Sequence, residues 1–160
     1  MQTIYLETSV LSYLTARPSK SLIAAAWQRE TFIWWESRRS EFELFVSEVV
    51  IEEAGRGDPR AASKRLAVVE GLPILPLSGD AVGLAASLVD VGALPPKALD
   101  DAFHVAIAAV HGIDFLLTLN CRHLSNAEAM PKMRKVIIEN GFQCPEIATQ
   151  MQLMGSDDDD

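Results

Sequence analysis

Short apolar runs alternate with longer helical segments along the whole chain, and this alternation limits the fold to one class. Three runs have the length of a strand and are largely apolar: residues 3–6, 43–46 and 114–119. A strand of this kind is buried on both faces, which is typical of a parallel sheet between two layers of helices. We therefore expect an α/β fold, a three-layer α/β/α sandwich with a mostly parallel central sheet.

Caps and breakers place helices between these strands. Thr8 or Ser9, and then Ser47, are suited to cap the helices that follow the first two strands. Pro131 must either kink the last expected helix or mark its true start. Two weaker strands, at 74–77 and at 146–149, complete the sheet, the second at an edge. The remaining helices are expected over residues 21–39, 60–70, 80–91, 96–111 and 126–140.

Length and composition indicate one globular domain. The chain has 160 residues, of which 49% are hydrophobic, and this suffices for one core. We expect the domain over residues 1–150 and an acidic, disordered tail over 151–160. No apolar run reaches the roughly 18 residues of a membrane span, and the N-terminus lacks the features of a signal peptide. Cys121 and Cys144 stand in no metal or redox spacing, which favours a cytoplasmic protein with reduced thiols.

The net charge of −8 at pH 7 argues against passive binding of nucleic acid, which depends on basic surface. Part of this charge belongs to the acidic tail, and the carboxylates of a metal site would add to it. An RNA substrate would then require both the metal and a local basic rim. Two groups are candidates, although each member is also typical of a solvated helix face: Arg56, Arg60, Lys64 and Arg65, or Arg122, Lys132, Arg134 and Lys135.

Four polar segments lie near expected strand ends or helix starts: residues 5–9, 46–53, 100–104 and 116–120. In an α/β fold such positions converge on one crevice outside the carboxyl ends of the strands. Carboxylates gathered there repel one another unless a cation lies among them. The pattern therefore indicates a divalent metal and, with it, hydrolysis of phosphodiesters.

Each acidic pair in these segments leaves a choice between neighbours. Adjacent residues on a helix point about 100° apart, so at most one of Glu52 and Glu53 faces the crevice. Glu53 shares an apolar face with two valines and is favoured, because a charge on such a face needs a partner. The pattern favours Asp101 over Asp100 only slightly.

The other polar residues each have two interpretations. Glu7 is a site residue or a charge that stabilises a helix N-terminus. His104 is a general base or, more commonly on a buried helix, a hydrogen-bonded structural residue. Asn120 is a site residue or a turn residue, and Thr118 orients a water at the metal or packs in the core.

Motifs for several other enzyme classes are missing. The sequence has no Gly-rich phosphate loop, no His-Glu-x-x-His and no Gly-x-Ser-x-Gly. Trp27, Trp34 and Trp35 are expected as core or interface anchors. Because tryptophan is enriched at such anchors, the helix at 21–39 is our candidate for a protein interface.

In their order along the chain, four motifs resemble the PIN-domain ribonucleases, in particular the VapC-like toxins of bacterial type II toxin–antitoxin pairs. Each motif alone is weak, but the ordered set is more specific, and the resemblance extends from Ile4 to about Thr149. The motifs are Tyr-Leu-Glu-Thr-Ser at 5–9, Val-Ser-Glu-Val-Val-Ile-Glu-Glu at 46–53, Leu-Pro-Pro-Lys-Ala-Leu-Asp-Asp-Ala-Phe-His-Val-Ala-Ile-Ala at 94–108 and Leu-Leu-Thr-Leu-Asn-Cys-Arg-His-Leu-Ser-Asn at 116–126.

The resemblance implies that Glu7, Glu53 and Asp101 hold Mg²⁺ or Mn²⁺ and that Asn120 completes the catalytic set. It also implies a homodimer and inhibition by a small antitoxin. Two departures stand out. Glu7 is one methylene longer than the aspartate usual at its position, and Asn120 removes a charge, which weakens any second metal site. We therefore expect one well-held metal and leave open a second that arrives with the substrate.

The main hypothesis is a metal-dependent endoribonuclease, the toxin of a toxin–antitoxin pair, with Asp101 accepting the proton of the attacking water. The alternative is a metal-binding, PIN-like interaction module with little or no nuclease activity, which the departures at Glu7 and Asn120 motivate. A small-molecule phosphatase of another α/β family is disfavoured, because the chain has no aspartyl nucleophile motif.

Overall fold

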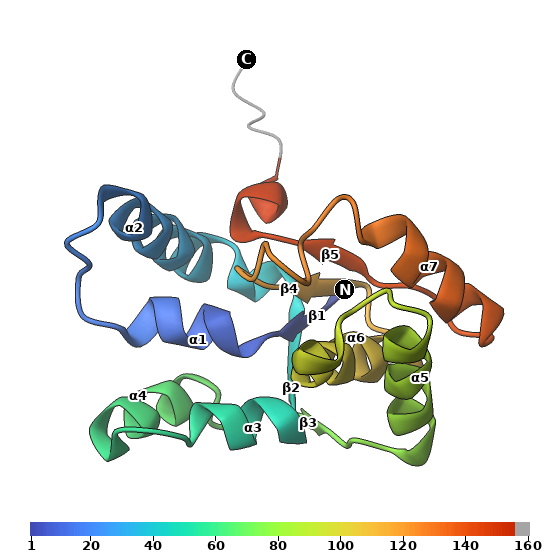
Figure 1. Cartoon of the computed structure of the whole chain (residues 1–160). Coiled ribbons are helices and arrows are strands. Elements are labelled where there is room, and N and C mark those ends of the chain that lie inside the picture. The colour runs from blue at the N-terminus through green and yellow to red at the C-terminus, as the bar shows by residue number, and fades with distance from the viewer. Residues whose placement is uncertain (156–160) are drawn as a thin grey trace.

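A five-stranded, wholly parallel sheet forms the centre of the molecule, with helices on both sides (Figure 1). The computed structural model describes residues 1–155. The strand order is β3-β2-β1-β4-β5, so β1 is central, and the expected three-layer α/β/α sandwich is confirmed. The strands are β1 (Thr3–Leu6), β2 (Glu43–Ser47), β3 (Ile74–Leu75), β4 (Phe115–Leu117) and β5 (Glu146–Ala148).

The helices begin and end close to the expected positions. The α-helices are α1 (Thr8–Thr15), α2 (Leu22–Ser37), α3 (Glu48–Ala54), α4 (Pro59–Val68), α5 (Gly79–Asp90), α6 (Leu99–Val110) and α7 (Met130–Glu139). Short 3-10 turns are η1 (Arg39–Glu41), η2 (Pro96–Ala98) and η3 (Gln150–Leu153). The helix expected from 126 begins only at Met130, because Pro131 occupies its first turn, where a missing N–H costs nothing.

Strand burial explains the apolar runs. Ile4, Tyr5 and Leu6 of β1 are fully buried, since β2 and β4 pair on either side and helices cover both faces. The register sets Tyr5 beside Phe45 of β2 and Leu116 of β4. The three strands therefore end at one edge of the sheet, and their next residues meet there.

Trp34 belongs to the core and is not available to a partner protein. Its side chain is fully buried, stacks on Phe42 with ring centroids 6.2 Å apart, and donates from Nε1 to the carbonyl of Leu153 at 3.2 Å. Of the two roles expected for this tryptophan, core or interface anchor, Trp34 has the first, because α2 turns this side chain inward. The exposed apolar side chains of α2 are Leu22, Ile23 and Phe32.

The contact between Trp34 and Leu153 also bears on the expected tail at 151–160. Residues 150–153 form η3, Leu153 is buried, and Thr149 caps this turn. The start of that segment is thus packed on α2, and residues 156–160 lie outside the described residues. Within residues 1–155, none of the helices combines the length and the apolar character that crossing a bilayer requires.

Candidate active site

Two hydrogen-bonded groups hold the four residues that the sequence pattern singled out, and the peptide bond between Glu7 and Thr8 joins the groups. Glu7 follows β1, Glu53 lies on α3, Asp101 lies in the first turn of α6 and Asn120 follows β4. The links pass through two threonines and backbone groups. They are Thr8 Oγ1 to Glu53 Oε1 (2.8 Å), Thr118 Oγ1 to Glu7 Oε1 (2.5 Å), Asn120 N to Thr118 Oγ1 (3.0 Å) and Asn120 Nδ2 to Asp101 Oδ1 (3.2 Å).

Glu7 folds back onto the helix that it precedes. Its Oε2 accepts from the backbone N–H of Ser9 at 2.8 Å, and its Oε1 accepts from the hydroxyls of Ser9 (2.6 Å) and Thr118 (2.5 Å). The side chain is 5% exposed and forms the N-cap of α1. Both carboxylate oxygens are therefore engaged with the protein. Ser9, whose hydroxyl also accepts from the N–H of Leu119, is a further site residue: it lies within the first sequence motif but was expected only as a helix cap.

A buried chain of hydrogen bonds fixes one carboxylate oxygen of Glu53. His104 Nε2 lies 2.5 Å from Glu53 Oε1, and His104 Nδ1 lies 2.6 Å from the hydroxyl of Tyr5. That hydroxyl is 2.6 Å from Ser47 Oγ, which caps α3 by accepting from the N–H of Val50. The chain runs from the N–H of Val50 through Ser47, Tyr5 and His104 to Glu53. If each group donates to the next in this order, every group in the chain has a hydrogen-bond partner. Tyr5, Ser47 and His104 are all fully buried, so His104 positions Glu53 and does not face the crevice.

This chain of partners keeps Glu53 ionised. Burial raises the pKa of the Glu53 carboxyl, but the hydrogen bonds from His104 and Thr8 outweigh it and hold the pKa below its ordinary value. For His104, burial lowers the pKa, and the hydrogen bond to Glu53 with the nearby carboxylates raises it, leaving the pKa above its usual range. The two shifts agree in direction, because each group stabilises the charged form of the other.

Asp101 lies in a different electrostatic environment. Burial, and after it the negative charge of Glu7, raises the pKa of the Asp101 carboxyl above its ordinary value. Its neighbour Asp100 points outward: its side chain is 49% exposed and lies 3.6 Å from Arg56. Glu52 is also exposed and pairs with Arg56 at 2.8 Å. The structure thus turns Glu53 and Asp101 inward and their neighbours Glu52 and Asp100 outward.

The charge of Glu7 supplies a direct test of this electrostatic arrangement. We expect Glu7→Gln to lower the pKa of Asp101 toward its ordinary value, because the amide removes the nearby negative charge that destabilises the ionised form. An NMR titration of the Asp101 carboxyl carbon in metal-free protein measures this shift. Glu52→Gln, which removes an exposed carboxylate, is the matched control and is expected to leave the pKa of Asp101 in place. An unchanged or higher value in Glu7→Gln would contradict the arrangement.

The donor atoms fit a divalent cation that retains water. Among residues 1–155, no three His, Cys, Asp or Glu side chains are arranged to hold an ion between them. Within the same residues, Glu53 Oε2 and Asp101 Oδ2 accept no hydrogen bond, while the other oxygen of each is fixed by one or two donors. Mg²⁺ commonly uses one or two carboxylates and completes its octahedron with waters and substrate phosphate. Such an ion suits this donor set better than a fully enclosed protein site.

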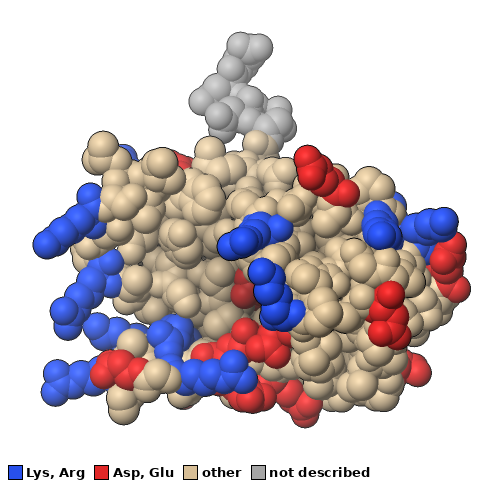
Figure 2. All heavy atoms as spheres, viewed as in Figure 1, with Lys and Arg blue, Asp and Glu red and all other residues tan. Residues whose placement is uncertain are grey.

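The two predicted basic rims have different hydrogen-bond and ion-pair partners in the structure. Arg65 donates to the carbonyls of Ala54 and Arg56 and so braces the turn between α3 and α4. Arg134 pairs with Glu146 at 3.4 Å, and Lys135 approaches Glu139 at 4.0 Å. In Figure 2, acidic side chains gather near the middle of the face and basic side chains flank them. An acidic centre with basic flanks suits a cation and a polyanion together.

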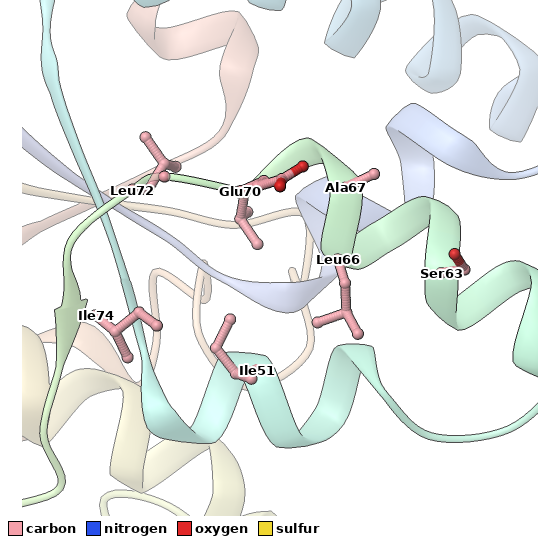
Figure 3. A pocket seen from close by; sticks show the side chains of 9 residues that line it. Ile51, Ser63, Leu66, Ala67, Glu70, Leu72 and Ile74 are labelled. Carbon is pink, nitrogen blue, oxygen red and sulfur yellow. The ribbon is translucent and has the colours of Figure 1, made fainter.

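A separate pocket between α3, α4 and β3 is apolar in character. Figure 3 shows Ile51 of α3 and Leu66 of α4 extending toward one another, with Ile74 of β3 beside them. None of the four candidate site residues lines this pocket. It therefore lies outside the candidate active site.

The fold and the order of its polar residues define a PIN domain. The sequence profile of the PIN domain family matches residues 4–128. The chain belongs to the PIN domain family, which confirms the family that the motifs indicated.

Solved structures with the same fold include proteins of toxin–antitoxin systems. VapBC2 from Rickettsia felis, solved bound to a DNA fragment from its promoter, is 13% identical with a TM-score of 0.58, covering 92% of this chain and 98% of that one. VapC20 from Mycobacterium tuberculosis, described as a sarcin–ricin loop cleaving toxin, is 17% identical with a TM-score of 0.59, covering 76% and 93%. A toxin–antitoxin complex from Klebsiella pneumoniae is 17% identical with a TM-score of 0.54, covering 79% and 93%.

These similarities concern the fold, because function depends on the site residues that each fold carries. No protein of curated function matches the chain by sequence. The activity of the chain must therefore be argued from its own residues.

Proposed function

We propose that this PIN domain is a metal-dependent endoribonuclease that hydrolyses RNA phosphodiester bonds, and that it is the toxin of a toxin–antitoxin pair. The observation that carries the proposal is a pair of carboxylate oxygens, Glu53 Oε2 on α3 and Asp101 Oδ2 on α6, that accept no hydrogen bond within residues 1–155 and lie on helices in contact with each other. The description of VapC20 as a sarcin–ricin loop cleaving toxin supports the substrate class.

In this proposal Glu53 and Asp101 bind Mg²⁺ or Mn²⁺, and Glu7 contributes through water and through its charge. When bound, such an ion stabilises charge on the phosphate and acidifies water for attack. We assign Asp101 to accept the proton of the attacking water, because its Oδ2 accepts no hydrogen bond within residues 1–155. Asn120 fixes Asp101 by donating from Nδ2 to Asp101 Oδ1, while the side-chain oxygen Oδ1 of Asn120 accepts from the backbone N–H groups of Arg122 and His123.

The other proposed metal ligand, Glu53, is held by the buried hydrogen bonds of His104, Tyr5 and Ser47. Glu53 receives two hydrogen bonds on one oxygen, which orients its second oxygen and keeps it ionised. Thr118 donates to Glu7 and accepts from the N–H of Asn120. It therefore links Glu7 to Asn120, which in turn donates to Asp101. Precise placement matters, since a 1 Å error in position can cost about 100-fold in rate.

The partners follow from the same proposal. A small antitoxin binds the protein in the cell, as the two neighbours solved as toxin–antitoxin assemblies suggest. The exposed Leu22, Ile23 and Phe32 of α2 give a protein partner apolar surface to bury. We also propose a homodimer, as the family resemblance implies, a single domain, as the chain length indicates, and a cytoplasmic location, as the two cysteines outside any redox spacing favour.

Two observations favour a second candidate, a metal-binding interaction module with little or no nuclease activity. Both oxygens of Glu7 are already bonded within the protein, and Asn120 contributes no charge. Such a protein would bind its partner tightly and leave RNA intact.

Metal removal separates the two candidates. We expect purified, antitoxin-free protein to cleave structured cellular RNA at discrete positions with Mg²⁺ or Mn²⁺, and excess EDTA to lower the rate by about 100-fold or more. Gel analysis of the products measures this, with metal restored after EDTA as the control for intact protein. Metal binding by calorimetry without any cleavage would favour the interaction module, and cleavage that survives EDTA would contradict the proposed mechanism.

A further inference from the structure

A basic pocket lies at the end of α1 opposite to the candidate active site. Its volume is about 500 Å³, and it opens between the end of α1 and the start of α4. The side chains that line it are Thr15, Ala16, Arg17, Asp58, Arg60, Ala61 and Lys64. Three of these seven residues are cationic on a chain whose net charge is −8, so the pocket opposes the average charge of the molecule.

The cationic side chains of this pocket are not paired with acidic side chains of the described residues. Arg17, Arg60 and Lys64 are exposed and take part in no ion pair within the described part of the chain. The one acidic residue of the lining, Asp58, directs Oδ2 to the backbone N–H of Ala61 at 3.0 Å as the N-cap of α4. The basic residues of α7 differ, since Arg134 and Lys135 have acidic partners.

Helix α1 connects the pocket to the candidate active site. Thr8 at its start donates to Glu53, and Thr15 at its end lines the pocket. Seven residue steps at 1.5 Å give about 10 Å between them, and α1 runs beside α3 and α4 (Figure 1). One nucleic acid strand can therefore contact the pocket and the carboxylates at the same time.

The chemistry of the lining selects an anion of a particular kind. Arginine presents a planar fork of donors that matches a phosphate in two-point contact, and lysine adds a point charge. Ala16 and Ala61 are the apolar members of the lining, so the pocket offers no large apolar surface for an amphipathic protein helix. A phosphate group of a nucleic acid backbone fits these features better than an acidic protein segment.

We propose that the pocket formed by Arg17, Arg60 and Lys64 binds a backbone phosphate of the RNA substrate, on the same strand as the bond that is cleaved. This inference rests on the proposed function and adds to it a substrate contact outside the catalytic carboxylates. It also explains how an acidic chain holds a polyanion, since this pocket and the metal each attract phosphate locally.

The test measures RNA binding without cleavage. Fluorescence anisotropy of a labelled single-stranded RNA is recorded with the Asp101→Asn protein in Mg²⁺, over a range of salt concentrations. Adding Arg17→Gln, Arg60→Gln and Lys64→Gln together is expected to weaken binding at low salt by about tenfold or more. For each RNA phosphate that the variant no longer neutralises, the slope of log affinity against log salt should also fall by about 0.7.

A matched variant removes the same charge elsewhere. Lys132→Gln, Arg134→Gln and Lys135→Gln on α7, in the same Asp101→Asn protein, are expected to leave the salt slope nearly unchanged. Thermal unfolding verifies that both triple variants are folded. Equal weakening by the two triple variants, or unchanged binding in the pocket variant, overturns the proposal. A pocket variant that keeps RNA affinity and loses affinity for an acidic protein partner also overturns it.

Length dependence locates the contact. An RNA too short to reach from the carboxylates to the pocket is expected to bind the parent and the pocket variant equally, and a longer RNA to distinguish them. Cleavage by the unsubstituted protein is assayed separately. If that protein binds RNA through the pocket and cleaves none, the proposed function fails and the pocket assignment stands; if it cleaves and the pocket variant binds like its parent, only the pocket assignment fails.

Discussion

Asp101→Asn is expected to lower the rate of metal-dependent RNA cleavage by at least about 100-fold, the range that loss of a catalytic acid or base typically costs. The substitution replaces Oδ2, the oxygen that accepts no hydrogen bond within the described residues, by an NH₂ group that neither binds a cation nor accepts a proton. The remaining amide oxygen can still accept from Asn120 Nδ2, so the fold should be retained. Single-turnover cleavage of a defined RNA measures the effect.

Asp100→Asn is the matched control for this experiment. Asp100 precedes Asp101 on α6 but is 49% exposed and lies 3.6 Å from Arg56, and surface ion pairs of this kind contribute little. We expect its cleavage rate to stay close to that of the unsubstituted protein. Normal cleavage by Asp101→Asn, or an equal loss in both variants, would remove Asp101 from its assigned role.

His104→Ala is expected to lower the free energy of unfolding by about 3 kcal/mol, the largest stability effect that the site predicts. The substitution removes one of the two hydrogen-bond partners of the buried Tyr5 hydroxyl and of Glu53 Oε1, which keep Ser47 and Thr8. A lost hydrogen bond costs about 0.5–1.5 kcal/mol, and about 1.5–3 kcal/mol where one group is charged. The substitution also opens a cavity beside a fully buried core. Urea unfolding followed by circular dichroism measures the change, with the slope of the transition used to verify a single cooperative step.

A second histidine provides the comparison. His111 at the end of α6 is only partly buried and approaches the carbonyl of Pro76 at 3.2 Å, so His111→Ala should cost less than about 1 kcal/mol. If the two variants unfolded at the same urea concentration, the buried chain of hydrogen bonds would not stabilise the fold as predicted. Because His104 acts through Glu53, metal binding measured by calorimetry should also weaken in His104→Ala and not in His111→Ala.

The apolar runs and their caps carry most of the information about the fold. Residues 3–6 carry no charge and are mostly apolar, which suits burial between two helical layers, and β1 is the central strand. Pro131 marks the true start of α7, because it removes an N–H. The sequence indicates Glu53 and Asp101 over their neighbours less firmly than it indicates the fold. Helical spacing gives the direction in which a side chain points but not the position of the crevice.

The sequence alone therefore determines the α/β class, the family and the segments that contribute polar side chains, since these depend on local pattern and on order along the chain. The tertiary structure decides the partners. Glu7 bonds to Thr118, 111 positions away, and Tyr5 to His104, 99 positions away. Such contacts exist only once β1 pairs with β4 in the observed register and α6 packs against α3, because hydrogen bonds act over about 3 Å and no local pattern encodes that proximity.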